Sequence, residues 1–368
     1  MRIAFFGSSL VSAYWNGAAT YYRGLLRALA GRGHEITFYE PDAFERQQNR
    51  DIPDPDWARV VVYPVDPQGG PEGQAGVRRA LADAADADLL VKASGVGVFD
   101  ELLEAAVLAQ RRSGQVVAFW DVDAPATLER MAADPADPFR ALVPRYDLVF
   151  TYGGGDPVID AYRDFGARRC VPIYNALDPE THHPTAPDPR FAGDLAFLGN
   201  RLPDREARVE EFFLRPAEEL TGRRFLLGGS GWGDRSLPAN VRWLGHVGTG
   251  DHNALNSTPL AVLNIHRDSM ARFGFSPATR VFEAAGAGAC LVTDAFRGVE
   301  QFLEPEREIL VAADGAEVAA HLDRLTRERA RAIGEAARRR VLAEHTYAHR
   351  AAEVEAVLDG AEPLERTA

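Results

Sequence analysis

The sequence alternates short, wholly apolar runs with longer segments in which apolar residues recur every three or four positions. The runs of the first half are too apolar for one-sided antiparallel strands and too short for buried helices, so they predict buried parallel strands. They lie at 2–7, 35–40, 59–64, 88–94, 115–121, 147–153 and 169–175. Helical spacing predicts helices between them, at 18–31, 74–86, 100–112, 125–132 and 157–165.

A proline-rich segment then interrupts the alternation. Residues 175–194 (NALDPETHHPTAPDPRFAGD) carry four prolines and show little periodicity, which predicts an interdomain linker. The alternation resumes after it. Strands are predicted at 195–199, 224–229, 241–245, 260–265, 289–294 and 308–312, and helices at 204–218, 277–286, 298–303, 316–327, 328–344 and 346–359.

Strands that alternate with helices in this way predict an α/β fold with two Rossmann-like, doubly wound parallel-sheet domains. The linker separates a first domain, residues 1–178, from a second domain, residues 179–345. In doubly wound sheets ligands bind beyond the carboxyl ends of the strands. Two such domains facing a cleft would place a shared site between them.

Charge and cysteine content narrow the class of protein. The chain has 368 residues, a net charge of -13 and no block of five or more basic residues, which argues against nucleic acid or an anionic membrane as the main partner. Cys170 and Cys290 lie in apolar runs and lack the spacing of a zinc site or a redox pair. The first strand begins almost at once, and no 18-residue apolar run follows. We expect a cytoplasmic protein without membrane insertion.

The richest stretch for chemistry is FSPATRVFEAAGAGACLVTD, residues 275–294. Arg280 and Glu283 are three positions apart on one predicted helix and therefore share a face. A carboxylate there can accept two hydrogen bonds from ribose hydroxyls, and the guanidinium can neutralise a phosphate. An ordinary surface ion pair is the alternative. The run of small residues that follows Glu283 (AAGAGA) lets the helix lie close to the sheet.

At these residues the chain resembles the glycosyltransferase-B superfamily, and more narrowly the CgeB-type, spore-maturation glycosyltransferase-like family. Further matching pieces are AFLGN followed by Pro203 and Arg205 (196–205), NVRWLGHV (240–247), PLAVLNIHR (259–267), Asp-Val-Asp-Ala-Pro (121–125) and HTYAHR (345–350). The resemblance covers nearly the whole chain and is more specific in the second domain.

The resemblance implies a role for each domain. The second would bind a nucleotide-sugar donor and the first would hold the acceptor, joined by a last helix, 346–368, that returns to it. Glu283 would bind the donor ribose. The backbone around Gly245, His246 and Val247 would meet the nucleobase.

The resemblance also implies a diphosphate site after the second domain's first strand. Gly199 and Asn200 end that strand, where backbone amides can face the diphosphate. Arg201 or Arg205 would supply positive charge, and Arg267, after another buried strand, would also reach a phosphate. A solvated face is the alternative for Arg201 and Arg205, because the sequence REARVEE around them is rich in charge.

One position departs from the family. Many retaining members carry two glutamates separated by seven residues, but counting back from Glu283 reaches Phe275, which has no carboxylate. Either another group takes the role of that glutamate near the sugar, or the reaction mechanism differs. Asp294 ends a strand and is either a further site residue or a helix cap.

Two glycine-containing loops are further candidates for phosphate binding. Gly17 begins the helix after the first strand, and the resemblance places such a glycine against the donor sugar and diphosphate, where a side chain would block approach. The loop lacks the dinucleotide glycine fingerprint, so NAD or FAD binding is not expected. GGSGWG (228–233) lacks the lysine of a P-loop and is interpreted as a turn.

Asp121 and Asp123 form an Asp-x-Asp string at the end of a predicted strand. Metal-binding strings of this kind belong to the single-domain glycosyltransferase-A architecture, whereas two-domain enzymes neutralise the diphosphate with helix N-termini and basic side chains. We therefore interpret them as acceptor-side carboxylates without a metal, one of them a general base. Capping of helix 125–132 and metal binding are the alternatives. His182, His183 and His266 show no ligand spacing.

The resemblance thus implies a glycosyltransferase that moves a hexose from a nucleoside-diphosphate sugar, uridine-linked, to an unidentified acceptor. It needs no metal and no cofactor, since the nucleotide-sugar is a co-substrate. Two alternatives remain: a nucleotide-sugar 2-epimerase, which needs no acceptor, and a non-catalytic sugar-nucleotide-binding or structural protein, which the missing glutamate favours.

Overall fold

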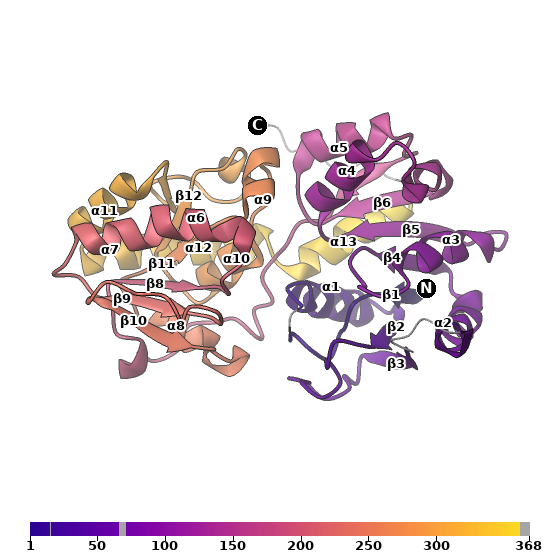
Figure 1. Cartoon of the computed structure of the whole chain (residues 1–368), viewed down its shortest axis with the longest axis horizontal. Coiled ribbons are helices and arrows are strands. Elements are labelled where there is room, and N and C mark those ends of the chain that lie inside the picture. The colour runs from indigo at the N-terminus through magenta and orange to yellow at the C-terminus, as the bar shows by residue number, and fades with distance from the viewer. Residues whose placement is uncertain (15, 66–70, 361–368) are drawn as a thin grey trace. The chain divides into compact units, whose positions relative to one another are not determined.

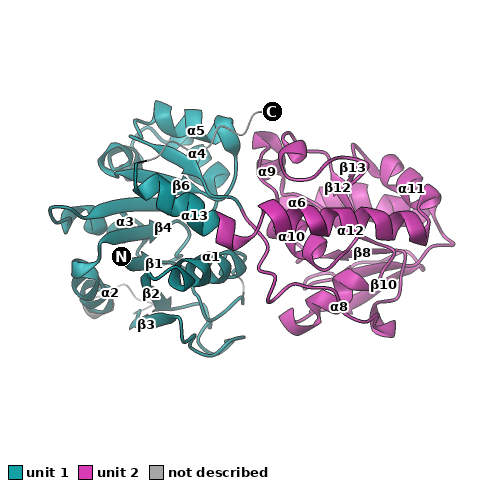
Figure 2. Cartoon of the chain, turned by 180° about the vertical axis from the view of Figure 1, so that it is seen from behind, with its two compact units in different colours: residues 1–174, 350–363 teal, residues 175–349, 364–368 magenta. Residues whose placement is uncertain are grey.

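The structure is a computed structural model that describes residues 1–14, 16–65 and 71–360. It contains two compact units, which Figure 2 colours separately. Within the described residues, the first comprises Met1–Tyr174 together with residues 350–360, and the second comprises Asn175–His349. Residues 361–368 of the segment expected to return to the first domain lie outside the described residues.

The first unit is built around a seven-stranded parallel sheet in the order β3-β2-β1-β4-β5-β6-β7 (Figure 1). Every strand predicted for this half is present. The strands are β1 (Arg2–Phe6), β2 (Glu35–Asp42), β3 (Ala58–Pro64), β4 (Leu89–Ala93), β5 (Val116–Asp121), β6 (Leu148–Thr151) and β7 (Cys170–Pro172). The connecting helices are α1 (Ala19–Gly31), α2 (Pro71–Asp83), α3 (Asp100–Ala109), α4 (Ala124–Ala133) and α5 (Gly155–Asp164).

The second unit has a six-stranded parallel sheet in the order β10-β9-β8-β11-β12-β13. Its strands are β8 (Leu195–Leu198), β9 (Phe225–Gly228), β10 (Val241–Gly245), β11 (Ala261–Asn264), β12 (Leu291–Asp294) and β13 (Leu310–Ala312). Its helices are α6 (Pro203–Val209), α7 (Arg215–Glu219), α8 (His252–Ser257), α9 (Asp268–Phe273), α10 (Thr279–Gly286), α11 (Gly315–Arg324) and α12 (Arg327–Glu344). The prediction of two doubly wound parallel sheets is confirmed.

Both faces of the second sheet are covered at β8 and β9, which explains why these two strands are apolar throughout. Leu195 and Phe197 of β8 point into one hydrophobic cluster, and Ala196 between them points into another. Leu226 of β9 likewise joins the second cluster, between two neighbours that join the first. Successive side chains of a strand alternate between faces, so a sheet covered on both sides needs apolar residues at every position.

Helix α13 (Tyr347–Leu358) packs on the first unit from Arg350 onward. The fully buried Arg350 donates from Nε to the Tyr174 carbonyl at 3.2 Å. Glu355 contacts His34 at 2.9 Å and forms an ion pair with Arg32. Within the described part of the chain, every helix falls short of the length or the apolarity that crossing a bilayer requires.

A group of buried charges lies where β4 meets α3. The Nζ of Lys92, which is fully buried, lies 2.7 Å from Asp100 Oδ1. Glu104, one turn further along α3, is only 4% exposed. Burial raises the pKa of Glu104 to about 7, although Lys92 and Arg130 act in the opposite direction.

We expect Glu104→Gln to stabilise the protein more at pH 8 than at pH 5. Because the folded pKa is raised, the stability that the neutral carboxyl gives is complete below the unfolded pKa of about 4.3 and is lost as pH rises through 7. Glutamine is neutral at both values, so its advantage should grow by about 2 kcal/mol between them. Urea unfolding measures this. The exposed Glu101→Gln is the control, and an equal effect of Glu104→Gln at both pH values contradicts the prediction.

Candidate functional site

The candidate site lies at the carboxyl edge of the second sheet, where the strand order changes direction. β8 and β11 are neighbours, while the strands that follow each of them run outward on opposite sides. Such a switch point leaves a crevice beyond the strand ends. Gly199, Asn200 and Arg201 follow β8, and His266 and Arg267 follow β11. The fold thus brings these predicted residues to one edge.

The backbone after β8 is tied to the glycine-rich turn 228–233. The Gly199 amide donates to the Gly228 carbonyl at 2.9 Å, and the Asn200 side chain accepts from the Ser230 amide at 3.0 Å. A Cβ on Gly229, whose φ is +118°, would lie 2.2 Å from the Gly199 carbonyl oxygen. The turn role of the glycines is confirmed. The prediction that the Gly199 amide faces a diphosphate is wrong, because that amide extends the sheet.

Two of the predicted phosphate-binding arginines are already paired with carboxylates. Arg201 contacts Glu206 at 2.7 Å and Asp234 at 3.0 Å. Arg267 forms an ion pair with Asp204 through Nε. These partners neutralise both guanidinium groups, so a phosphate would have to compete for them.

Arg280 and Glu283 lie on α10, as their spacing predicts, in a poorly solvated setting. Burial lowers the pKa of Arg280 to about 10; Glu283 opposes that shift and Arg205 adds to it. Arg205 and Arg280 therefore lie within electrostatic reach of each other, with Glu283 beside them. An anion bound here would offset the cost of burying the Arg280 charge.

Helix α10 lies close to the linker because its small residues allow it. A Cβ on Gly286 would lie 2.3 Å from the Leu177 side chain and 3.1 Å from the His182 carbonyl oxygen. The glycine therefore brings Glu283, three residues earlier on the helix, near the linker. The Nε2 atom of His182 lies 3.7 Å from Glu283 Oε1, and the Glu283 side chain is 14% exposed.

His252, at the start of α8, completes this group and was not predicted from the sequence. Ligand atoms of His182, His252 and Glu283 all lie within 4.8 Å of one another. Burial lowers the pKa of His252, although the Glu283 charge opposes this. Of His182, His183 and His266, the three histidines named in the sequence analysis, only His182 belongs to this group. His183 is exposed, and His266 bonds elsewhere.

The residues expected at the nucleobase lie just after β10. Gly245 has a φ of +70° and accepts from the Gly229 amide at 2.7 Å. His246 is exposed, whereas the Val247 side chain is 8% exposed and packs with Leu226 and Leu255. The Val247 side chain is therefore core, and its backbone is the part left for a base.

Asp294 is neither exposed nor a helix cap. It is fully buried and contacts His266 Nδ1 at 2.6 Å and Arg208 at 2.5 Å. Burial acts to raise the pKa of Asp294, but His266 and Arg208 outweigh it and hold the pKa below its usual range. The network fixes the ends of β11 and β12, which is a structural role.

Phe275 occupies the position of the missing glutamate as part of the core. It is 9% exposed and has a φ of +46°. The Arg297 guanidinium lies 5.1 Å from the centre of its ring, and a Cβ on Gly298 would lie 2.1 Å from that ring. An apolar ring, rather than a carboxylate, is built into this turn.

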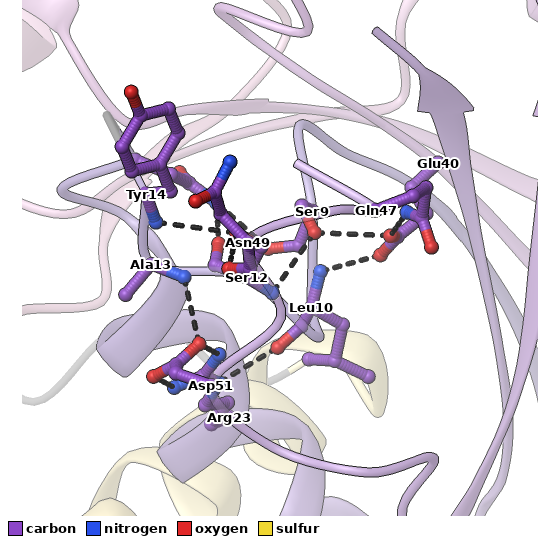
Figure 3. A network of polar contacts seen from close by, with 11 residues as sticks. Ser9, Leu10, Ser12, Ala13, Tyr14, Arg23, Glu40, Gln47, Asn49 and Asp51 are labelled. Carbon is purple, nitrogen blue, oxygen red and sulfur yellow. Dashed lines mark hydrogen bonds and ion pairs between the residues drawn. The ribbon is translucent and has the colours of Figure 1, made fainter. Parts of the chain in front are cut away.

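In the first unit, the loop after β1 is held by Glu40 of β2 and by Asp51, which follows β2 (Figure 3). The fully buried Glu40 accepts from the Ser9 hydroxyl at 3.0 Å and the Leu10 amide at 2.6 Å. Asp51 accepts from the Ala13 amide at 2.9 Å and pairs with Arg23. These contacts fix the loop's path independently of any ligand.

Gly17, which follows this loop, is exposed, and a Cβ there would meet no atom within 4 Å. Folding of the first unit therefore does not demand a glycine at this position. The open surface leaves the backbone accessible from outside.

Asp121 is not available to an acceptor, so its interpretation as an acceptor-side carboxylate is corrected. It is fully buried, and its Oδ1 accepts from Ser94 Oγ at 2.7 Å, Thr127 Oγ1 at 3.1 Å and the Asp123 amide at 3.0 Å. Its Oδ2 accepts from the Tyr162 hydroxyl. Burial raises the pKa of Asp121, against these hydrogen bonds. With both oxygens engaged, it organises the end of β5 rather than taking a substrate proton.

Asp123 is partly exposed and stands at the N-cap position of α4. Its side chain makes no capping hydrogen bond, so that alternative is not realised for it. The hydrogen bond from its amide to Asp121 fixes its backbone. Of the two aspartates, Asp123 is the one with access to solvent.

Residues 205–356 match a family model described as glycosyl transferase-like. Comparison with curated proteins finds no match. Among solved structures, sucrose-phosphate synthase from Thermosynechococcus elongatus is similar at 16% identity, with a TM-score of 0.72 and coverage of 98% of both chains. Anabaena HepE, in complex with UDP and glucose, is 14% identical at a TM-score of 0.64, covering 98% of this chain and 100% of that one.

A glycosyltransferase from Rickettsia africae is similar at 11% identity, with a TM-score of 0.66 and coverage of 98% of both chains. At these identities the matches concern the fold. The chain has the glycosyltransferase-B fold.

Proposed function

We propose that this protein is a glycosyltransferase that moves a hexose from a uridine diphosphate sugar to an acceptor, in the manner of the CgeB-type family. The observation that carries the proposal is the group of Arg205, Arg280 and Glu283 at the carboxyl edge of the second sheet. It combines the buried Arg280 guanidinium, a second guanidinium within electrostatic range and a partly exposed carboxylate, inside the segment that matches the glycosyl transferase-like family.

In this proposal the second unit binds the donor. Glu283 accepts hydrogen bonds from the ribose hydroxyls, and Arg280 with Arg205 faces the diphosphate. Arg201 and Arg267 take part by exchanging carboxylate partners for phosphate oxygens. The backbone at His246 and Val247 meets the base, and the backbone at Gly17 approaches the sugar and diphosphate.

The transfer breaks the bond between the anomeric carbon and the diphosphate oxygen and forms a bond from the acceptor to that carbon. Negative charge develops on the leaving diphosphate, where the arginines stabilise it, and this removes the need for a metal ion or another cofactor. The acceptor's proton passes to a base, for which we propose Asp123.

A thermal shift screen tests the donor site. We expect UDP to stabilise the protein more than GDP or dTDP, by about 2.7 kcal/mol at a hundredfold excess over its Kd. The stabilisation should be the same in EDTA and in Mg²⁺, because arginines and not a metal bind the diphosphate. Stabilisation that depends on Mg²⁺ contradicts the metal-independent mechanism, and no response to any nucleotide contradicts the function.

A second candidate function is sugar-nucleotide binding without turnover, which the core role of Phe275 favours. It shares the thermal shift result with the first. Incubation with UDP-glucose separates them, since only a transferase or a hydrolysing enzyme releases UDP. An epimerase would convert the donor to a second nucleotide sugar without any acceptor.

A further inference from the structure

Three segments far apart in the sequence bring two imidazoles and a carboxylate together in the second unit. His182 comes from the linker, His252 from the start of α8, and Glu283 from α10. Each offers one ligand atom, and these atoms lie within 4.8 Å of one another. Ligands about 2.0 Å from a tetrahedral zinc ion are about 3.3 Å apart. The 3.7 Å between His182 and Glu283 is close to that spacing.

The two histidine segments are clamped to each other by Asn253, the residue after His252. Its Nδ2 donates to the Thr181 carbonyl at 2.9 Å, and its Oδ1 accepts from the His183 amide at 3.2 Å. Both bonds flank His182. The backbone therefore fixes the spacing of the imidazoles before any ligand arrives, which lowers the cost of binding one.

One ring nitrogen of each imidazole has a polar partner in the chain. His182 Nδ1 lies 2.9 Å from Thr181 Oγ1, and His252 Nε2 lies 3.3 Å from the Val247 carbonyl. A carbonyl only accepts, so Nε2 of His252 carries the proton and its Nδ1 keeps a lone pair. Such outer partners orient the histidine ligands of metal sites.

We propose that His182, His252 and Glu283 form a site for a divalent transition-metal ion, with Zn²⁺ preferred. Two imidazoles and one carboxylate are ligands that zinc takes, whereas Mg²⁺ and Ca²⁺ require oxygen ligands. Three protein ligands leave a fourth position for water. The positive charge of Arg280, which also acts on His252, works against the ion and limits its affinity.

The site regulates donor binding. This step rests on the proposed function, in which Glu283 binds the donor ribose. A zinc ion on Glu283 withdraws the carboxylate from the ribose, so that zinc and UDP exclude each other. By linkage, each weakens the other by the same factor.

Zinc binding is tested first and without nucleotide. Calorimetric titration of ZnCl₂ should find one site in the wild type, at least tenfold weaker in both His182→Ala and His252→Ala. The exposed His183→Ala is the matched control and should bind as the wild type does. His182→Asn, with thermal melts of every variant, guards against loss of fold. Unchanged zinc affinity in both variants, or no zinc binding by the wild type, overturns the site.

Competition is tested next, with UDP titrated into the protein with and without saturating Zn²⁺. We expect zinc to raise the apparent Kd for UDP at least tenfold in the wild type and in His183→Ala, and to leave it unchanged in His182→Ala. Equal UDP affinity in zinc-loaded and zinc-free wild type overturns the regulation. Failure of UDP to bind under either condition overturns the proposed function instead, while the zinc titration still decides the site.

Discussion

Glu283→Ala should weaken UDP binding about 30- to 100-fold without unfolding the protein. A hydrogen bond to a charged group contributes about 1.5–3 kcal/mol, and about 2–2.7 kcal/mol corresponds to that range in Kd. The Glu283 side chain is 14% exposed and on the surface of α10, so its loss leaves no buried cavity. Calorimetry with UDP measures the change, and Glu300→Ala, an exposed glutamate in the same unit, is the control.

Pyrophosphate separates the ribose role from a general electrostatic effect. It carries the diphosphate charge but no ribose, so Glu283→Ala should leave its binding unchanged, or tighten it, because the variant removes a negative charge beside Arg280. Equal weakening of UDP and pyrophosphate would contradict the ribose assignment. Since the ribose contact is the same in the ground state and the transition state, donor KM should rise while kcat changes little.

The strands could be predicted because a parallel sheet covered on both faces imposes a simple pattern. Every position of such a strand is buried, so runs such as 260–265 stand out against their surroundings. Helix ends and short helices are harder to predict from the sequence. α8 (His252–Ser257) and α9 (Asp268–Phe273) were missed, since six residues make fewer than two turns and show no period.

The helix predicted at 204–218 shows how a local detail escapes a periodicity argument. It is present, but Glu210–Leu214 form a π-helical segment between α6 and α7. Pro216 lies two residues after this segment and has no N–H to donate to the helical hydrogen-bond pattern. π-helical turns and prolines both occur where a helix bends or departs from regular geometry. The apolar period alone does not reveal them.

The site was predictable only where residues are close in sequence. Arg280 and Glu283 share a helix face by spacing, which the structure bears out in their placement on α10. His252 joins Glu283 only through tertiary packing, and no spacing signals that. The burial of Asp121 could not be predicted from the sequence either. A polar residue at a strand end faces solvent or the interior depending on its neighbours in the fold, such as Tyr162, which lies 41 residues away in the sequence.

Asp123→Asn should lower kcat about 10²- to 10⁴-fold while leaving the Kd for UDP unchanged. Asparagine keeps the shape of the side chain but accepts no proton, and a positioned general base contributes about that factor. UDP release from UDP-glucose measures the rate, with an acceptor that the wild type turns over, or with water in its place. Asp156→Asn, an exposed aspartate at the start of α5, is the control.

Asp121→Ala distinguishes the two aspartates, because it should act on stability rather than on chemistry. It leaves the hydroxyl groups of Ser94 and Tyr162 buried without the Asp121 acceptor and removes one acceptor of Thr127, at an expected cost of about 3–5 kcal/mol in the free energy of unfolding. Urea unfolding measures this. Full activity of Asp123→Asn would contradict the assignment of Asp123 as the general base. A lower rate in Asp121→Ala with unchanged stability would instead indicate that the buried Asp121 carboxylate takes part in the reaction.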